Sequence, residues 1–152
     1  EVVFRSTQYL SDADAQAIAV YLRALPQRAI APAEVVKPSA ATLERGAKVY
    51  EQHCAQCHGD NGEGKPGAFP ALAGNRAVVL QDPTNLVRVV LQGGYLPATA
   101  GNPRPHGMPP FMQVLGDDDV AAVSTFVRNA WGNQAPAVGT IGVYRARERR
   151  GS

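Results

Sequence analysis

The residues best suited to chemistry lie in one hexapeptide, His53-Cys54-Ala55-Gln56-Cys57-His58, which holds the only two cysteines of the chain. A Cys-x-x-Cys-His sequence is typical of a c-type haem attachment site. We expect the two thiols to form thioether bonds to the haem vinyl groups and His58 to bind the iron from the proximal side. The spacing supports this, because one turn of chain spans the porphyrin edge and places the next residue beneath the ring.

Three other kinds of site use closely spaced cysteines. A thioredoxin-like redox pair requires a preceding strand, whereas the residues before Cys54 have a helical pattern. Four zinc ligands packed into six residues can hardly surround a tetrahedral ion, and no second ligand pair lies elsewhere in the sequence. A disulfide at this spacing closes too small a loop to stabilise the chain much. Haem attachment is therefore the favoured interpretation.

The haem iron needs a ligand on its open face, and Met108 is the leading candidate. It lies in His106-Gly107-Met108-Pro109-Pro110-Phe111, where the prolines restrict the backbone and the glycine allows close approach to the ring. A thioether ligand favours ferrous iron and raises the reduction potential. Most methionines fill gaps in cores, but residues 95–112 carry five prolines and too little apolar periodicity to need a filler. We expect Met112 and Phe111 to pack against the macrocycle or its rim.

Two further histidines are weaker candidates for the distal position. A bis-histidine haem would have a lower potential than one with histidine and methionine ligands. His53 is too close to Cys54 to reach the opposite face of the ring. His106 stays open as an alternative, although its position suits a solvent-exposed side chain equally well.

Length and composition limit the classes of protein to which the chain can belong. A chain of 152 residues accommodates one domain plus extensions, and an apolar fraction of 45% with 18% charged residues is ordinary for a soluble globular protein. Aromatic residues are sparse, and a buried porphyrin would supply much of the missing apolar volume. No apolar run is long enough to cross a bilayer. The chain starts at Glu1 without a signal peptide, so we expect a processed or excised piece.

The formal charge of +2 is unevenly distributed. Residues 134–152 contain four arginines and one glutamate, a net charge of +3, which leaves −1 for the rest of the chain. Basic residues do not interleave with aromatic residues along any face, and we therefore expect no nucleic-acid partner.

The hydrophobic pattern predicts helices separated by proline- and glycine-rich segments. Pro26, Pro32 and Pro38 indicate a semi-extended linker over residues 26–40. Residues 134–152 look irregular, with Val138 to Tyr144 as a candidate extended segment. The expected helices cover residues 11–25, about 42–52 with a cap at Thr42 or Ser39, a stretch that begins at Asp82-Pro83-Thr84 and stops at Gly93-Gly94, and a last one from Gly116–Asp119 to about Ala130.

The first and last of these helices match each other in sequence. Residues 8–14 align with residues 113–119, and the match continues through pairs such as Ala17 with Ala122 and Tyr21 with Phe126. Repetition of a supersecondary pattern indicates a repeated unit. We therefore interpret residues 1–25 as the last helix of an upstream copy of the same domain, with chance similarity of two amphipathic helices as the alternative.

Residues 41–133 resemble a class I c-type cytochrome domain. The resemblance is carried by Gly46 and Tyr50 in the first helix, Cys54-x-x-Cys57-His58-Gly59, Pro70-x-Leu72, Gly107-Met108-Pro109-Pro110-Phe111, and the last helix with Phe126. It implies an all-α fold with three to four helices around one covalently bound haem c and its iron, plus an extra N-terminal helix.

The same resemblance implies details of the site. The first and last helices would cross at Gly46 and Phe126, and the carbonyl of Pro70 would accept a hydrogen bond from His58, which orients the imidazole. We take as the iron ligands His58 and Met108. The residues expected to bind the haem are Cys54, Cys57, His58, Met108, Pro70, Phe69, Leu72, Val87, Val90, Leu91 and Phe111.

Gly101-Asn102-Pro103-Arg104-Pro105 and Ser6-Thr7-Gln8 narrow the resemblance. With these segments the chain is similar to the last haem domain of the multihaem cytochrome subunits of bacterial membrane-bound dehydrogenases. Those subunits carry haem domains in tandem and pass electrons from a flavin or pyrroloquinoline quinone subunit toward ubiquinone. The resemblance divides the chain into residues 1–25 from an upstream haem domain, linker 26–40, cytochrome domain 41–133 and a basic tail over 134–152.

The resemblance also implies where the protein works and with what. It points to the periplasm, on the outer side of the bacterial cytoplasmic membrane, with membrane-surface association through the complex. The expected partners are a dehydrogenase subunit, other haem domains, and a quinone or oxidase. Because this chain holds a single Cys-x-x-Cys-His motif, a free-standing carrier remains the alternative to a tandem arrangement.

The expected function is one-electron transfer rather than catalysis. With both axial positions filled, no substrate binds and no general acid or base is needed. A second hypothesis is a haem enzyme or sensor in which a labile Met108 admits peroxide or a gas to the iron. A third is a haem-bearing docking module whose role is assembly.

Overall fold

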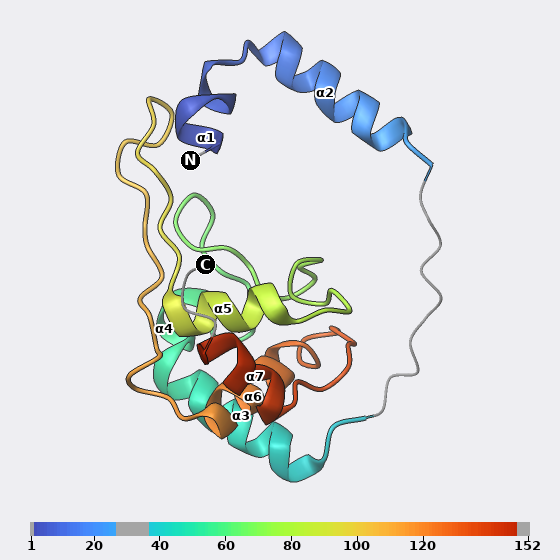
Figure 1. Ribbon diagram of the computed structural model, residues 1–152, viewed down its shortest axis with the longest axis vertical. Coiled ribbons are helices and arrows are strands. Elements are labelled where there is room, and N and C mark those ends of the chain that lie inside the picture. Colours follow the sequence, from blue (N-terminus) through green and yellow to red (C-terminus); the bar gives the residue numbers. More distant parts are fainter. Residues whose placement is uncertain (1, 27–36, 149–152) are drawn as a thin grey trace. The chain divides into compact units, whose positions relative to one another are not determined.

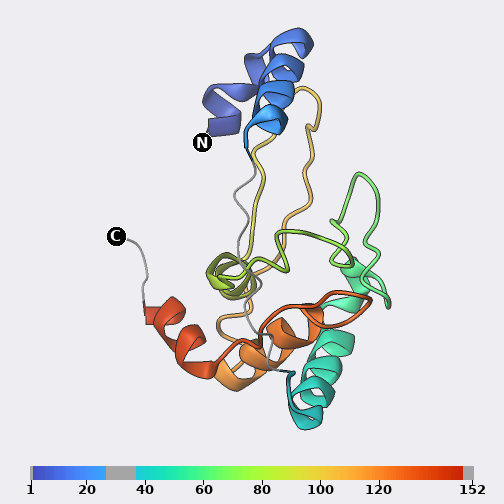
Figure 2. The ribbon, with the colours of Figure 1, turned by 90° about the vertical axis from the view of Figure 1, so that its right-hand side faces the viewer.

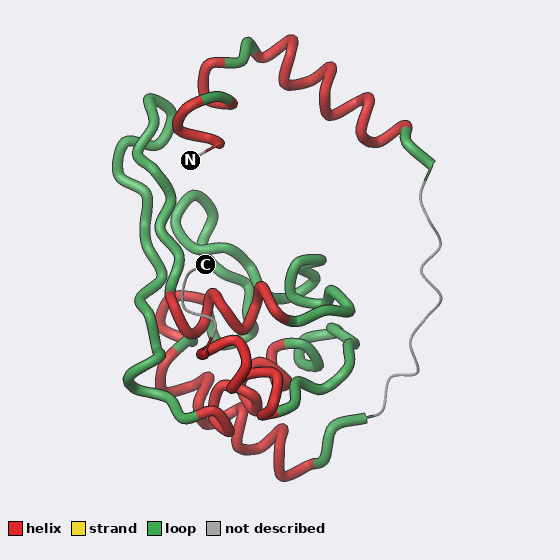
Figure 3. Tube along the Cα trace, viewed as in Figure 1, coloured by secondary structure: helices red, strands yellow, loops and turns green. Residues whose placement is uncertain are grey.

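The computed structural model describes residues 2–26 and 37–148, and these form helices joined by loops (Figure 3). In these residues no strand occurs, and the extended pairing consists of two isolated bridges, between Lys65 and Phe69 and between Gly94 and Met108. The predicted all-α class is confirmed. None of the helices over this part of the chain combines the length and apolar character needed to cross a membrane.

The described residues fall into two compact units. One comprises the N-terminal helices together with residues 95–105, and the other comprises residues 37–94 and 106–148. The predicted linker over residues 26–40 lies largely outside the described residues, which leave out 27–36.

The N-terminal unit contains α1 (Val2–Arg5), the 3₁₀ helix η1 (Thr7–Tyr9) and α2 (Asp12–Ala24) (Figure 1). The Ser11 hydroxyl accepts a hydrogen bond from the Asp14 amide at 3.1 Å, which caps α2. Asp12 and Asp14 then lie in the first turn, where the helix dipole favours negative charge. The helix predicted over residues 11–25 is confirmed to within a residue at each end.

The larger unit is built on the crossing of α3 (Ala40–His53) and α6 (Asp117–Val127). A Cβ added at Gly46 would collide with the carbonyl oxygen of Ala122 and lie 2.6 Å from Cβ of Phe126. Only glycine therefore allows the two backbones to approach this closely. The predicted crossing at Gly46 and Phe126 is confirmed. Of the two proposed caps of α3, Ser39 is the one used, since its hydroxyl accepts from the Thr42 amide at 3.1 Å.

Helix α5 (Thr84–Gln92) begins and ends close to the predicted signals. The Asp82 carboxylate accepts the Thr84 amide at 2.9 Å, and Pro83 lies just before the first helical residue. Gly93 follows the helix with φ of 76°, a left-handed conformation that favours glycine. Helix α6 is shorter than predicted and ends at Val127, because the chain continues in tight turns through Arg128 to Ala130.

The C-terminal region differs from the prediction. The prediction of an irregular tail over 134–152, with an extended segment from Val138 to Tyr144, is wrong for Thr140–Glu148, which form helix α7. Residues 149–152 of that tail lie outside the described residues. Helix α7 packs on α5 and α6, with Val143 fully buried, and Figure 2 shows α6 between α3 and α7. The apolar stripe of α7 is only Val143 and Ala146, too narrow to predict, and helices this short are stabilised mainly by packing.

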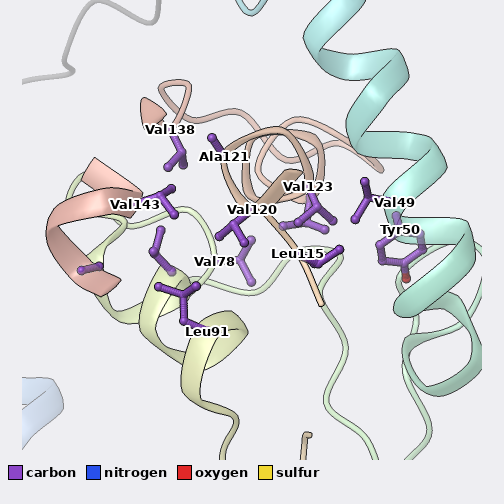
Figure 4. Close-up of a cluster of buried hydrophobic side chains, with 13 residues drawn as sticks. Val49, Tyr50, Val78, Leu91, Leu115, Val120, Ala121, Val123, Val138 and Val143 are labelled. Carbon is purple, nitrogen blue, oxygen red and sulfur yellow. The ribbon is translucent and has the colours of Figure 1, made fainter. Parts of the chain in front are cut away.

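The hydrophobic core lies between these helices. Leu91 of α5, Val120 of α6 and Val143 of α7 point into one cluster and are inaccessible to solvent (Figure 4). The cluster also contains a side chain from each connecting segment, such as Val78 and Val138. The C-terminal helix is therefore part of the same core as the helices that carry the candidate site.

One charged side chain is completely buried beside this core. The guanidinium of Arg128 donates from Nη1 to the carbonyls of Val78 and Leu80, at 2.7 and 2.8 Å, and from Nε to Pro136 at 3.1 Å. Burial lowers the pKa of this guanidinium from its ordinary value. Arg128 thus joins the loop before α5 to the segment that leads into α7.

Candidate haem-binding site

The Cys-x-x-Cys-His motif lies where α3 gives way to the single-turn helix α4 (Ala55–His58). The Cys54 amide donates to the Tyr50 carbonyl at 2.8 Å, and the His58 amide donates to the Cys54 carbonyl at 3.0 Å. Cys54 and His58 are therefore one helical turn apart. The helical residues before Cys54 also agree with the argument against a thioredoxin-like site, which needs a strand there.

Both cysteines are free thiols and half-buried. Burial, with a smaller contribution from the neighbouring Cys57, raises the pKa of the Cys54 thiol to about 11. The Cys54 thiol is therefore uncharged near neutral pH. Its partly buried position keeps this sulfur at the edge of the hydrophobic core, where an apolar ring would pack.

The buried imidazole of His58 donates a hydrogen bond from Nδ1 to the carbonyl oxygen of Pro70, 2.9 Å away, so the predicted bond is confirmed. Because Nδ1 carries the proton, Nε2 keeps its lone pair for a metal. Two free thiols and an imidazole with one free nitrogen, all within five residues, form a donor set that fits one covalent haem c.

The loop after His58 is held by contacts that the sequence did not predict. The Tyr50 hydroxyl donates to the Gly59 carbonyl at 2.6 Å, and the Leu72 amide donates to the Gly62 carbonyl at 2.7 Å. The Tyr50 ring lies 4.9 Å from the Trp131 ring, and Gly62 leaves room for this indole. The motif is thus braced by α3 and by the segment that follows α6.

A buried amide also holds the Pro70 segment. Asn133 accepts the Gly74 amide at 3.0 Å and donates to the carbonyls of Leu72 and Val127, at 3.0 and 2.7 Å. It therefore joins the loop that carries Pro70 to the end of α6. No periodic pattern marks this asparagine in the sequence, and only its burial among backbone carbonyls shows its role.

The Met108 backbone is paired with Gly94 at the end of α5. The Met108 amide donates to the Gly94 carbonyl at 2.8 Å, and the Gly94 amide donates back at 3.1 Å. Three and four residues on, the amides of Phe111 and Met112 donate to the carbonyls of Val90 and Leu91, both at 3.0 Å. These bonds satisfy carbonyls at the C-terminal end of α5 that have no partner within the helix. The Met108 side chain is half-buried, and its role as iron ligand stays a prediction.

The predicted pocket residues occupy two kinds of position. Leu72, Val90 and Phe111 are partly buried and pack on the edge of the core, and Phe69 is also half-buried. Val87 and Leu91 lie inside the core, with 2% and 0% of their surface exposed. All six haem contacts remain predictions, and the two core residues also anchor α5.

The two other histidines contact aromatic rings. His106 is exposed, with its ring centroid 5.0 Å from that of Phe69. His53 lies 5.9 Å from the ring of Phe111. Over residues 2–26 and 37–148, no group of three or more histidine, cysteine, aspartate or glutamate residues is placed to hold a metal ion.

Residues 43–131 match the family model described as Cytochrome c. The cytochrome c subunit of a quinone-dependent alcohol dehydrogenase from Gluconacetobacter polyoxogenes is 40% identical over 152 residues, which covers 93% of this chain and 32% of that protein. The gluconate 2-dehydrogenase cytochrome c subunit from Pantoea cypripedii is 36% identical, over 92% of this chain and 34% of the relative. Cytochrome c-552 from Thermus thermophilus is 38% identical over 91 residues, 58% of this chain and 69% of the relative. The chain spans about a third of the length of the two dehydrogenase subunits.

Proposed function

Because the chain belongs to the cytochrome c family, we propose that it carries single electrons through one haem c, bound by Cys54 and Cys57, with His58 and Met108 as axial ligands. When bound, the haem supplies the reversible one-electron chemistry of its iron. Cys54 and Cys57 would attach the ring, and His58 and Met108 would hold its iron.

The observation that carries this proposal is the hydrogen bond from His58 to Pro70 beside two free thiols. It leaves one imidazole nitrogen as a ligand and restrains its direction, so that the ligand geometry changes little between oxidation states. The Met108 backbone is restrained in a similar way by its paired bonds to Gly94. A thioether in the second position favours the reduced iron.

The first test compares two methionine variants. Met108→Ala should lose the far-red charge-transfer band that arises from methionine bound to ferric iron, and the variant should bind added imidazole or cyanide readily. Met112→Ala should keep the band, because Met112 is assigned only a packing role. A high-spin ferric spectrum of the unaltered protein at neutral pH would contradict the proposal and favour a haem enzyme or sensor.

The proposal extends to the domain organisation. Helices α2 and α6 begin at equivalent positions of the internal repeat, Asp12 and Asp117, which are 105 residues apart. In α6 the repeat residues Val123 and Val127 are buried. Their counterparts in α2, Ile18 and Leu22, are 47% and 55% exposed. We therefore assign residues 1–25 to the end of an upstream haem domain, in which this apolar face would pack on a helix equivalent to α3. The linker predicted over 26–40 then leads to the cytochrome domain predicted over 41–133, to whose core α7 adds Val143 and Ala146.

The names of the relatives support an assignment of partners. They are cytochrome c subunits of alcohol and gluconate dehydrogenases, and we propose that this chain accepts electrons from a dehydrogenase subunit or a preceding haem. It would pass them to a quinone or another cytochrome on the periplasmic side of the membrane. Such encounters involve small, transient interfaces, unless tandem domains hold the haems together.

Deletion of residues 1–25 separates electron transfer from assembly. The shortened chain should keep the methionine–iron band, because the helices around the motif lie in the other unit. Its reduction by the partner dehydrogenase should slow if the N-terminal helix packs on an upstream domain. A loss of the band on deletion would contradict the division into domains.

A further inference from the structure

Arg147 of helix α7 makes three hydrogen bonds to the segment that follows Met108. Its Nε donates to the Asp117 carboxylate at 2.6 Å, and its Nη1 and Nη2 donate to the carbonyls of Met112 and Leu115, at 2.6 and 3.0 Å. The side chains of Arg147 and Asp117 are only 22% and 25% exposed. Partial burial makes charge-assisted bonds of this kind stronger than those of a surface ion pair.

The two carbonyl acceptors lie in a short turn just before α6. Between Phe111 and Leu115 the chain makes one turn, in which the amides of Val114 and Leu115 donate to the Phe111 carbonyl at 3.0 and 2.9 Å. This turn lies outside the helices, and the carbonyls of Met112 and Leu115 accept hydrogen bonds from Arg147. The guanidinium of Arg147 supplies both donors from one plane.

The segment with Met108 is therefore held from two sides. On one side the backbone of residues 108–112 is bonded to the end of α5 through Gly94, Val90 and Leu91. On the other side Arg147 holds residues 112–115 and the first turn of α6. Helix α7 itself is anchored in the core by Val143, which is fully buried.

We propose that Arg147 is a positioning residue for the axial methionine. It joins the C-terminal helix to the turn four residues beyond Met108, and so limits the opening of that segment away from the haem. The inference rests on the proposed ligation by Met108. It assigns the C-terminal helix a role in stabilising the methionine–iron bond.

Geometry explains why arginine is suited to this position. Three donors in a rigid fork reach one carboxylate and two carbonyls at once. A lysine amine is a point charge on a flexible chain, and it cannot match the fork. Arg147→Lys should therefore hold the segment after Met108 less firmly than the native arginine does. Asp117→Asn should weaken one of the three bonds and leave the two carbonyl bonds in place.

The test measures how fast imidazole displaces the methionine from ferric haem in the full chain. Loss of one charge-assisted hydrogen bond corresponds to about a tenfold change in an opening equilibrium, so Arg147→Met should speed imidazole binding by about tenfold or more. Arg147→Lys and Asp117→Asn should give smaller increases. Arg145→Met is the matched control, because Arg145 is exposed in the same helix, and it should bind imidazole at the rate of the unaltered protein.

A second measurement separates positioning from general stability. In urea, the methionine–iron band of Arg147→Met should disappear at a lower denaturant concentration than the far-ultraviolet helical signal, whereas the two transitions should nearly coincide in the unaltered protein. Coincident transitions in Arg147→Met, or an unchanged imidazole rate, would overturn this inference alone. Absence of the band from the unaltered protein would instead remove the proposed Met108 ligation, and this inference with it.

Discussion

The Tyr50 hydroxyl donates a hydrogen bond to the Gly59 carbonyl over 2.6 Å. This contact joins the last turn of α3 to the residue directly after His58. Because Tyr50 is also in ring contact with Phe126 and Trp131, it connects the helix crossing to the loop that carries the candidate iron ligand. The geometry of His58 thus depends on a side chain eight residues earlier.

Replacement of Tyr50 by phenylalanine removes this bond and keeps the ring. We expect Tyr50→Phe to lower the free energy of unfolding by about 1 kcal/mol, the typical net value of one hydrogen bond. The measurement is urea unfolding of the haem-loaded protein. Tyr144→Phe is the matched control, because that ring is 54% exposed, and an equal loss in both variants would show that the Gly59 bond contributes nothing.

The same residue predicts a pH dependence at high pH. Burial raises the pKa of Tyr50 from its ordinary value of 10 to about 12, so the folded protein holds the phenol proton more tightly than the unfolded chain does. The raised pKa of Tyr50 contributes fully to the free energy of unfolding below pH 10. This contribution, about 2–3 kcal/mol at most, is lost as the pH rises through 12.

Unfolding free energies measured from pH 9 to pH 12 should therefore fall more steeply for the unaltered protein than for Tyr50→Phe, which has no phenol at this position. The difference between the two curves isolates Tyr50 from the other groups that titrate in this range. Parallel curves would contradict the assignment.

Two helical glycines should respond to alanine in opposite directions. Gly46→Ala places a methyl group against the Ala122 carbonyl and Cβ of Phe126, and we expect a loss of about 1–3 kcal/mol from overpacking. Gly142 in α7 has nothing within 4 Å of an added Cβ, so Gly142→Ala should stabilise the protein by about 0.5–1 kcal/mol through helix propensity. Thermal unfolding of the two variants checks both signs, and a stabilising Gly46→Ala would show that the helices separate at little cost.

Arg128 should contribute more to the free energy of unfolding than an ordinary surface arginine does. Arg128→Met leaves the carbonyls of Val78 and Leu80 without their donor, and we expect a loss of about 2–4 kcal/mol for two bonds to a charged group. The exposed Arg76 provides the control, and Arg76→Met should change the unfolding free energy by less than about 0.5 kcal/mol. Equal stabilities of the two variants would contradict the bracing role.

The sequence predicted most of what local chemistry can specify. The adjacency of Cys54, Cys57 and His58 predicted a haem attachment site, and the family resemblance that includes Gly46 predicted where two helices cross. The caps at Ser11, Ser39 and Asp82 set the starts of helices within a residue or two. Such signals act over a few residues, and they can be read without knowledge of the fold.

The sequence did not predict helix α7. Its two buried residues, Val143 and Ala146, are three positions apart in a basic, glycine-containing segment, and a single pair at this spacing is a weak helical signal. The helix forms because Leu91 and Val120 provide a surface for that narrow stripe, and those residues lie far away in the chain. A pattern this short carries too little local information to distinguish a helix from an irregular tail.

By itself, the sequence determined the cofactor class and the places of α2, α3, α5 and α6, because covalent haem attachment needs only neighbouring residues and these helices carry local periodicity and capping signals. Tertiary structure alone decided how the site is held. The bond from His58 to Pro70 had been expected from family resemblance, but the contacts of Tyr50, Asn133 and Arg147 join residues up to 61 positions apart. These contacts form because each side chain donates a hydrogen bond to a backbone carbonyl of a loop or turn. Which carbonyl lies within reach is decided only when the chain is folded.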